Sequence, residues 1–206
     1  MRTFWPPRLK IFEFEQGTDE WFEVRRGVIT GSNFSKVFTS AGKASSSCSS
    51  LVNQLISENL TKKPTETFKS EAMQRGNDLE PVARAKFELI TGLDVRQIGF
   101  AKHDEYNLGC SPDGLIGERC GLEIKCPMAA THCAYLRAGK LPSAYVQQVQ
   151  GCMYILDLES YYFMSYHPDM PELIIEVKRD NELLELALPL LIKASALVTS
   201  ETKRLE

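Results

Sequence analysis

The sequence predicts an α/β fold in which helices flank a mixed central β-sheet. Two observations support this prediction. Helical patterns dominate the first 92 residues, where apolar side chains recur every three to four positions. From residue 94 onward, short runs rich in β-branched and aromatic residues are interleaved with further helical segments. Strands that are joined through helices favour a sheet with helices packed on its faces.

Each element is predicted from its periodicity and its end signals. Helices are expected where a capping residue or a glycine stop bounds an apolar stripe. These ranges are 19–26, 33–39, 51–60, 70–92, 129–138, 144–156 and 181–203. Strands are expected over 94–100, 108–110, 121–126, 159–167 and 172–178. Residues 1–15 are expected to form a flexible arm, and residues 1–206 to form a single domain that ends in a leucine-rich helix.

Composition bounds the kind of protein. The chain has 206 residues, 43% of them hydrophobic and 25% charged, which is ordinary for a soluble protein. Its formal net charge of -3 does not mark it as a nucleic-acid binder, so any such contact must come from local clustering. We expect no membrane span and no secretory signal, and therefore a cytoplasmic location.

The six cysteines show no CxxC pair, which zinc and iron–sulfur frameworks usually contain. In a reducing compartment they are most simply free thiols, several of them buried. The three histidines are scattered and are interpreted as structural or surface residues.

The most informative stretch runs from residue 111 to residue 127, SPDGLIGERCGLEIKCP. It places Asp113 on a tight turn and then Glu123 and Lys125 on a strand. The period of two puts Leu122 and Ile124 on one face of that strand and Glu123 and Lys125 together on the other. Two carboxylates with a backbone carbonyl form an all-oxygen site suited to Mg²⁺ or Mn²⁺, and a lysine beside them can hold a water. The pattern alone is short and common, and a hairpin with a surface salt bridge would also produce it.

A third carboxylate lies at a predicted discontinuity of the helix over 70–92. Pro81 lacks an amide donor and restricts Glu80, so a kink or a new first turn is expected there. Glu80 is therefore either a functional carboxylate or a helix-start acid favoured by the dipole. Leu79, Ala83, Phe87 and Ile90 form the stripe expected to face the core.

With these motifs together, the chain resembles the PD-(D/E)xK nucleases, and within them the phage lambda exonuclease-like, YqaJ-type viral recombinase branch. Asp113 followed by Glu123-Ile124-Lys125 is similar to the catalytic core of that superfamily. Gln150 and Tyr154 form a QxxxY pattern on the following helix. The segments QGTDEWFEVRRGVITGS (16–32) and RGNDLEP (75–81) complete the pattern.

The resemblance implies a PD-(D/E)xK fold and a site with two Mg²⁺ ions, with Mn²⁺ able to substitute. Asp113 would bridge the two metals, and Glu123 and the backbone carbonyl of Ile124 would hold the first. Glu80 would complete the set at the second metal, directly or through water. Lys125 would activate or orient the attacking water.

The resemblance further implies digestion of linear double-stranded DNA from the 5′ end to 5′-mononucleotides, which leaves 3′ single-stranded tails for recombination. Arg25, Ser32, Ser111 and Gln150 would form the pocket for the 5′-phosphate. Each has an ordinary alternative as a helix-end charge, a cap, a turn residue or an exposed helix residue. The partners implied are DNA ends, two further copies in a homotrimeric ring, and a single-strand annealing protein.

Three other functions remain open at this stage. One is a structure-selective or site-specific endonuclease on the same core. A second is a non-catalytic DNA-end-binding protein, although the presence of all three carboxylates and the lysine argues against it. A third is a structural protein that binds metal through cysteines, which their spacing disfavours.

Overall fold

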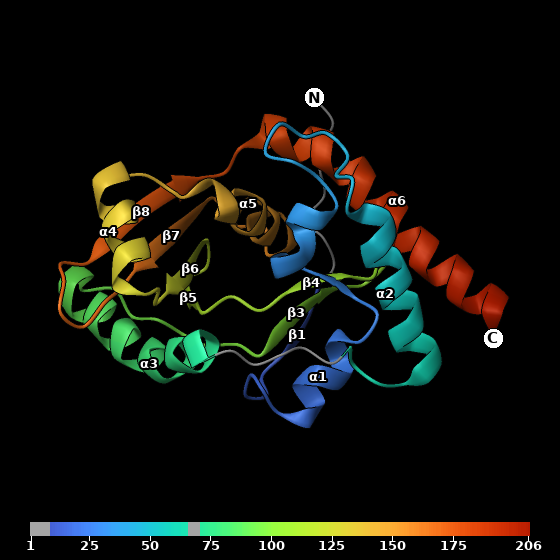
Figure 1. Cartoon of the computed structure of the whole chain (residues 1–206), viewed down its shortest axis with the longest axis horizontal. Helices are drawn as coiled ribbons and strands as arrows, with labels where there is room; N and C mark the ends of the chain where they lie inside the picture. The colour runs from blue at the N-terminus through green and yellow to red at the C-terminus, as the bar shows by residue number, and fades with distance from the viewer. Residues whose placement is uncertain (1–8, 66–70) are drawn as a thin grey trace.

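The computed structural model describes residues 9–65 and 71–206, and it confirms the α/β class with mixed sheets flanked by helices (Figure 1). The elements follow in this order: β1 (Leu9–Phe12), α1 (Asp19–Arg25), β2 (Ile29–Thr30), η1 (Gly31–Lys36, a 3₁₀ helix), α2 (Cys48–Thr61), α3 (Glu71–Thr91), β3 (Phe100–His103), β4 (Leu108–Cys110), β5 (Gly114–Ile116), β6 (Cys120–Lys125), α4 (Ala129–Ala138), η2 (Ser143–Tyr145, also 3₁₀), α5 (Val146–Ile155), β7 (Ser160–Ser165), β8 (Leu173–Lys178) and α6 (Asn181–Leu205).

The strands form two four-stranded sheets, ordered β1-β3-β4-β2 and β5-β6-β7-β8, where the sequence predicted one central sheet. In the first sheet, β2 and β4 are parallel, so their carboxyl ends lie at the same edge. In the second sheet, β6 is an inner strand that pairs antiparallel with β5 and parallel with β7. The parallel connection from β6 to β7 passes through α4 and α5, as parallel strands require.

Two hydrophobic clusters hold these layers together. The larger cluster joins the first sheet to η1, α2, α5 and α6. The smaller one lies between α3 and the second sheet, where Ala83 and Phe87 of α3 pack against Leu122 and Ile124 of β6. The period of two predicted for β6 is confirmed, because Leu122 and Ile124 both pack in this cluster while Glu123 pairs with Lys125 outside it.

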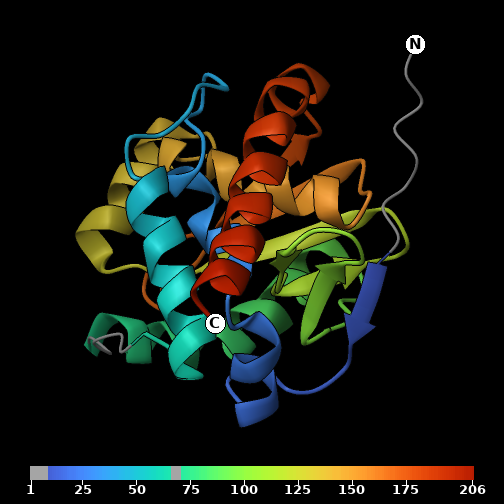
Figure 2. The same ribbon diagram turned by 90° about the vertical axis from the view of Figure 1, so that its right-hand side faces the viewer.

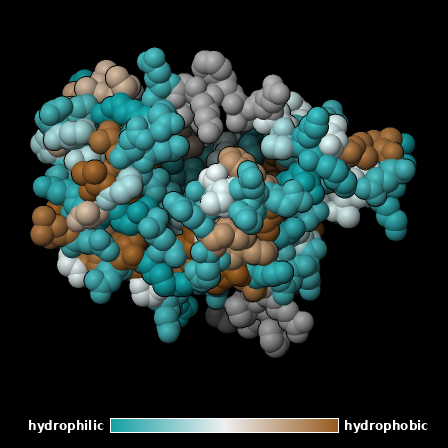
Figure 3. Space-filling model, turned by 90° about the horizontal axis from the view of Figure 1, so that it is seen from below, coloured by the Kyte–Doolittle hydropathy of each residue, from teal (hydrophilic) through white to brown (hydrophobic). Residues whose placement is uncertain are grey.

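Helix α6 combines length with high hydrophobicity, and its most apolar window has a mean hydropathy of 1.6, enough by length and composition to cross a membrane. Its apolar face is instead part of the larger cluster, and it lies beside α2 (Figures 1 and 2). Asn59 of α2 donates to Thr202 at 3.3 Å, and Asn107 donates through its backbone to Ser195 at 2.8 Å. Such contacts are those of a core helix in a folded protein. The face of the molecule seen in Figure 3 is mainly hydrophilic, with hydrophobic side chains in small separate patches.

Several predicted elements differ from the structure. The helix predicted over 33–39 is the 3₁₀ helix η1, in which Val37 donates to the Phe34 carbonyl, and the helix predicted from 144 begins as η2. The strand predicted over 94–100 is shifted to 100–103, and before it only Arg96 forms a bridge, to Leu115. β5 was not predicted, because it begins directly after Asp113, within the stretch interpreted as a turn.

The N-terminal arm and two expectations for the helix over 70–92 also need correction. Residues 9–12 form β1, which pairs antiparallel with β3, while residues 1–8 lie outside the described residues. No new helix begins at Pro81, because α3 runs from Glu71 to Thr91 with the proline inside it, and the predicted core residue Ile90 is 49% exposed. Pro81 lacks the amide for one helical bond, but the residues on both sides of it are helical, and Glu80 is part of the continuous helix.

Two helical glycines give a paired test of the packing. A Cβ on Gly151 of α5 would overlap the buried ring of Phe34, whereas a Cβ on Gly76 of α3 would meet nothing within 4 Å. We predict that Gly151→Ala lowers the free energy of unfolding by about 1–3 kcal/mol through overpacking. Gly76→Ala should raise it by up to about 1 kcal/mol through helix propensity. Urea denaturation checks both, and equal effects of the two changes would contradict the packing described.

Candidate active site

The site is built around two charged side chains on the inner strand β6. Glu123 is 1% exposed and forms an ion pair with Lys125, whose side chain is 29% exposed. The ammonium of Lys125 also lies 5.5 Å from the ring centre of Tyr145. Strand β7 pairs with β6 as far as Lys125, whereas β5 pairs only with Cys120–Leu122. The positions of Glu123 and Lys125 are therefore fixed by β7 on one side and, on the other, by the bond from the Ile124 amide to Asp113. The sequence left open that this pair is a surface salt bridge. In the structure, the glutamate of the pair is buried.

Asp113 is attached to β6 through its turn. Its Oδ2 accepts a hydrogen bond from the backbone amide of Ile124 at 2.6 Å, and its own amide donates to the Leu122 carbonyl at 3.1 Å. On the other side, Gln16 donates to the Pro112 carbonyl at 3.0 Å. The turn therefore presents the Asp113 carboxylate beside Glu123 and Lys125, as the sequence predicted.

Helix α3 supplies the third carboxylate. Glu80 accepts a hydrogen bond at 2.5 Å from Nη2 of Arg84, one turn further along the helix. The same guanidinium donates through Nε to the backbone carbonyl of Asp113 at 3.2 Å. Glu80 and Asp113 are thus brought together through Arg84, a residue that the sequence analysis did not single out.

The charges of this cluster are strongly coupled. Burial raises the pKa of Glu123 to about 7, with Lys125 opposing and Asp113 adding to the rise. Burial and the Asp113 carboxylate likewise raise the pKa of Glu80 to about 7 against the effect of Arg84. The pKa of Asp113 is also raised, chiefly by burial. Burial lowers the pKa of Lys125, but the two carboxylates raise it more, so the lysine stays protonated. Burial is thus the main reason why the ionised forms of the three carboxylates are disfavoured, and their mutual repulsion adds to it at Glu80 and Glu123.

A second group of side chains lies at the ends of α1 and β4. Arg25 donates to the Ser111 hydroxyl at 3.1 Å and stacks on the Trp21 ring, 3.9 Å from its centre. The Trp21 indole donates to the same hydroxyl at 2.9 Å, and Ser111 donates to the Gly99 carbonyl at 2.7 Å. Burial lowers the pKa of Arg25 to about 10, which leaves it charged at neutral pH. Two of the four predicted phosphate ligands are therefore in contact.

Ser32 follows β2 as Ser111 follows β4. The two strands are parallel, with Thr30 paired to Gly109, so both serines lie just beyond the same edge of the sheet. Ser32 is exposed, and its hydroxyl lies 3.3 Å from that of Thr30. It is available to a ligand that approaches this edge.

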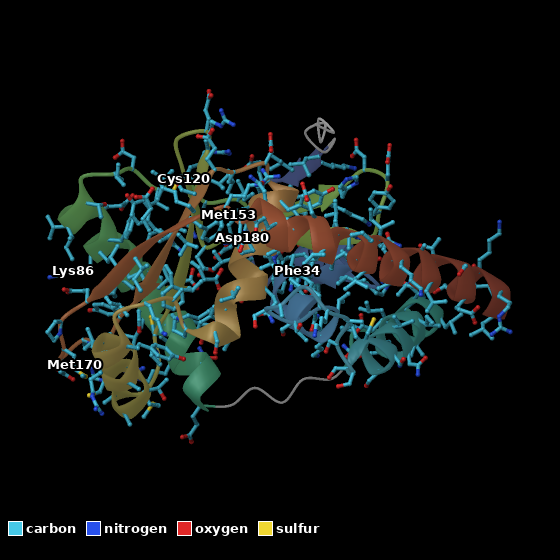
Figure 4. All side chains as sticks on the ribbon, turned by 90° about the horizontal axis from the view of Figure 1, so that it is seen from above. Phe34, Lys86, Cys120, Met153, Met170 and Asp180 are labelled. Carbon is cyan, nitrogen blue, oxygen red and sulfur yellow. The ribbon has the colours of Figure 1, made fainter. Side chains whose placement is uncertain are left out.

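The fourth predicted ligand, Gln150, lies elsewhere. Its amide nitrogen donates to the Lys178 carbonyl at 3.0 Å, and its oxygen accepts from the Asp180 amide at 2.8 Å. It is 4% exposed and holds α5 against the start of α6, where Figure 4 labels Asp180. Tyr154 is 9% exposed, so the QxxxY pair is a buried, structural feature of α5.

Gln148, two positions earlier, points into the site in its place. Its amide nitrogen donates to Oε1 of Glu123 at 2.5 Å, and its Cγ lies 3.7 Å from the Cβ position of Gly31, next to Ser32. Gln148 therefore lies between the carboxylate group and the edge of the sheet from which Ser32 extends. A two-residue step turns a side chain to the opposite side of a helix, so only the orientation of α5 could decide between the two glutamines.

Comparisons with known proteins identify the family of this chain. The sequence model of the YqaJ-like viral recombinase domain matches residues 20–159, more than half of the chain. The chain belongs to this family. No curated protein sequence matches it.

Solved structures resemble this YqaJ-like chain over most of its length. Crystal structures of LHK-Exo, an alkaline exonuclease from Laribacter hongkongensis, one of them in complex with dAMP, superpose with a TM-score of 0.82 at 32% sequence identity, covering 91% of this chain and 96% of theirs. A phage-related exonuclease from Haemophilus somnus shares the fold, with a TM-score of 0.65 at 17% identity, covering 87% of this chain and 96% of that one. Family and neighbours together support a nuclease.

The donor set of the YqaJ-like site fits a divalent metal. Among the described residues, no hydrogen-bond partner lies against the buried Oε2 of Glu123. An unpaired buried carboxylate oxygen is costly, and a cation would satisfy it. No group of three or more His, Cys, Asp or Glu side chains within residues 9–65 and 71–206 is arranged to hold a metal as it stands. To bind a metal, the Glu80 carboxylate would have to give up part of its hydrogen bonding to Arg84.

The two glutamines of the YqaJ-like site lead to opposite expectations for stability. Gln150→Ala removes two bonds of a buried side chain and leaves the Lys178 carbonyl and the Asp180 amide without it, so we predict a loss of about 1–3 kcal/mol in the free energy of unfolding. Gln148→Ala removes one bond to Oε1 of Glu123, which keeps Lys125 as a partner, and should cost less. Chemical denaturation of the two variants tests this, and a larger loss in Gln148→Ala would contradict their assignment.

Proposed function

We propose that the protein is a metal-dependent 5′-to-3′ exonuclease. It digests one strand of linear double-stranded DNA to 5′-mononucleotides and leaves 3′ single-stranded tails for recombination by strand annealing. The observation that carries this proposal is the position of Gln148, which donates to the Glu123 carboxylate and lies against Gly31, at the edge that β2 and β4 share. A group suited to a terminal phosphate thus lies next to a group suited to a metal.

In the proposed site, Asp113, Glu123, the Ile124 carbonyl and Glu80 would hold two Mg²⁺ ions, with Asp113 shared between them and Glu80 at the second. Mn²⁺ is the expected substitute, since it also prefers oxygen ligands. When bound, the metals supply charge stabilisation for the attacking and leaving oxygens of an in-line displacement. The pKa values of Glu123 and Glu80 are raised chiefly by burial and further by Asp113, and a nearby dication would favour the ionised form of both carboxylates.

Lys125 is proposed to orient the attacking water. Its pKa is raised by Glu123 and Asp113, so in the metal-free protein it is a hydrogen-bond donor and not a base. Its ammonium lies where β6 ends, beside the carboxylates that would surround the water. A fixed donor at this place orients a lone pair toward the phosphorus.

Arg25, Ser32, Ser111 and Gln148 are proposed to bind the terminal 5′-phosphate, with Gln148 in the role first assigned to Gln150. A guanidinium offers a planar pair of donors to phosphate oxygens, and hydroxyl and amide groups add neutral donors. The stacking of Arg25 on Trp21 holds that pair in one orientation. The dAMP in the LHK-Exo structure supports a mononucleotide as the product.

The proposed partners are linear DNA ends, two further copies of the chain in a ring, and a single-strand annealing protein. The net charge of -3 favours a ring over a purely electrostatic grip, because a closed ring retains DNA by topology. The main alternative activity is a structure-selective or site-specific endonuclease, which the same metal site would support.

A digestion time course tests the activity. Linear duplex with a labelled 5′ nucleotide is incubated with Mg²⁺ beside covalently closed circles and an EDTA control. Early release of labelled mononucleotide from linear DNA alone is expected. Cleavage of circles would replace the proposal by an endonuclease, and absence of cleavage with any divalent metal would leave a DNA-end-binding protein.

We predict that Lys125→Ala reduces cleavage by at least about 10³-fold while DNA-end binding stays within about twofold, because the lysine acts on the water and not on the substrate. The exposed Lys178, paired with Glu176, provides a matched control, and Lys178→Ala should retain full activity. Substantial cleavage by Lys125→Ala would exclude the mechanism. Fluorescence anisotropy and product release measure the two properties.

We predict that Arg25→Ala loses discrimination between 5′-phosphoryl and 5′-hydroxyl ends. A charge-assisted bond to phosphate contributes about 1.5–3 kcal/mol, so the rate ratio should fall by about ten- to a hundredfold. Arg96, whose ion pair with Glu13 is exposed, provides the control through Arg96→Ala. An unchanged ratio in Arg25→Ala would remove this residue from the pocket.

A further inference from the structure

Arg84 contacts two of the proposed metal ligands but has no role in the proposed function. Its side chain is 12% exposed and extends from α3 toward the Asp113 turn. Nη2 donates to Glu80 at 2.5 Å, and Nε donates to the Asp113 backbone carbonyl at 3.2 Å. One planar group thereby connects two proposed metal ligands that are 33 positions apart in the sequence.

The contacts require arginine in particular. The two bonds leave the guanidinium from different nitrogens and reach acceptors on different elements, α3 and the turn before β5. A lysine offers a single ammonium on a flexible stem and would have to choose between the acceptors or lie between them. The order along the helix, with the acid four residues before the base, is also the more favourable one for such pairs.

Electrostatics explain why such a contact is needed. Glu80 and Asp113 repel one another, as the rise that Asp113 causes in the pKa of Glu80 shows. Without a cation between their elements, Glu80 would gain by rotating into solvent, since its side chain is already 31% exposed. Arg84 offsets this repulsion and keeps the carboxylate directed toward the turn.

We propose that Arg84 is a positioning residue that holds Glu80 toward the Asp113 turn and so presets the site for its second divalent cation. The inference rests on the proposed function, because it takes Glu80 and Asp113 as metal ligands. Arg84 does not itself touch metal or substrate. Its effect is on the affinity for the metal, since residues that orient ligands typically change metal affinity by about 10–100-fold.

The opposite effect is the physical rival. A guanidinium close to the carboxylates also repels a dication, and its removal would then tighten metal binding. One donor of Arg84 already binds the neutral backbone carbonyl of Asp113. This bond keeps the guanidinium in place whether or not Glu80 turns to a metal. We therefore expect the gain from orientation to exceed the cost of repulsion.

The test is calorimetric titration of the DNA-free protein with Mn²⁺ alone, which has a readout independent of cleavage. Arg84→Gln is expected to weaken Mn²⁺ binding by about tenfold or more, and Arg84→Lys to weaken it by less. The control is Arg204→Gln, which removes an exposed arginine from a helical pair with Glu201. Thermal unfolding in EDTA shows that each variant is folded. If Arg84→Gln does not fold, Arg84→Lys decides.

A double variant shows whether Arg84 acts through Glu80. Glu80→Gln alone should weaken Mn²⁺ binding, and adding Arg84→Gln should then cost less than twofold more. Unchanged or tighter binding in the single Arg84 variants, with weaker binding in Glu80→Gln, would overturn the inference and leave the proposed function intact. Unchanged binding in Glu80→Gln would overturn the carboxylate set of the proposed function, and the inference with it.

Discussion

The elements around the site depend on one constraint, the buried ion pair of Glu123 and Lys125. Burying a carboxylate is costly, and one cation on the same strand does not fully offset that cost, because Oε2 of Glu123 keeps no partner among the described residues. A fold optimised for stability alone would replace such a pair by apolar side chains. The pairing of Glu123 with Phe163 of β7 and the bond from Gln148 hold the carboxylate where it would otherwise turn to water.

The two sheets explain how separate parts of the chain meet at this pair. The parallel strands β2 and β4 end at one edge and deliver Ser32 and Ser111 there, and the chain then turns at Asp113 into the second sheet. Helix α5 touches both groups, since Gln148 bonds Glu123 and packs near Gly31. Neither sheet alone contains the site, which depends on the packing of α5 across both.

Sequence periodicity was sufficient for the parts of the site that lie on regular elements. Alternation in residues 121–126 placed Glu123 and Lys125 correctly, because one face of β6 is buried against α3. The same reasoning could not separate Gln148 from Gln150, since the helix was predicted to start two residues too early and its orientation comes from packing. Arg84 was missed for a similar reason: its partners are a side chain one turn away and a carbonyl from a distant turn.

A DNA end brings negative charge to a site that already holds three carboxylates, so cations at fixed positions are a condition for binding it. Lys125, Arg84 and Arg25 are each held by a carboxylate, a carbonyl or an aromatic ring, and none depends on a mobile surface side chain. Fixed charges require little reorganisation when a phosphate arrives, which is the usual source of electrostatic catalysis. The acidic composition of the whole chain is therefore compatible with a nucleic-acid substrate, because the local arrangement of charge and not its sum determines what the site attracts.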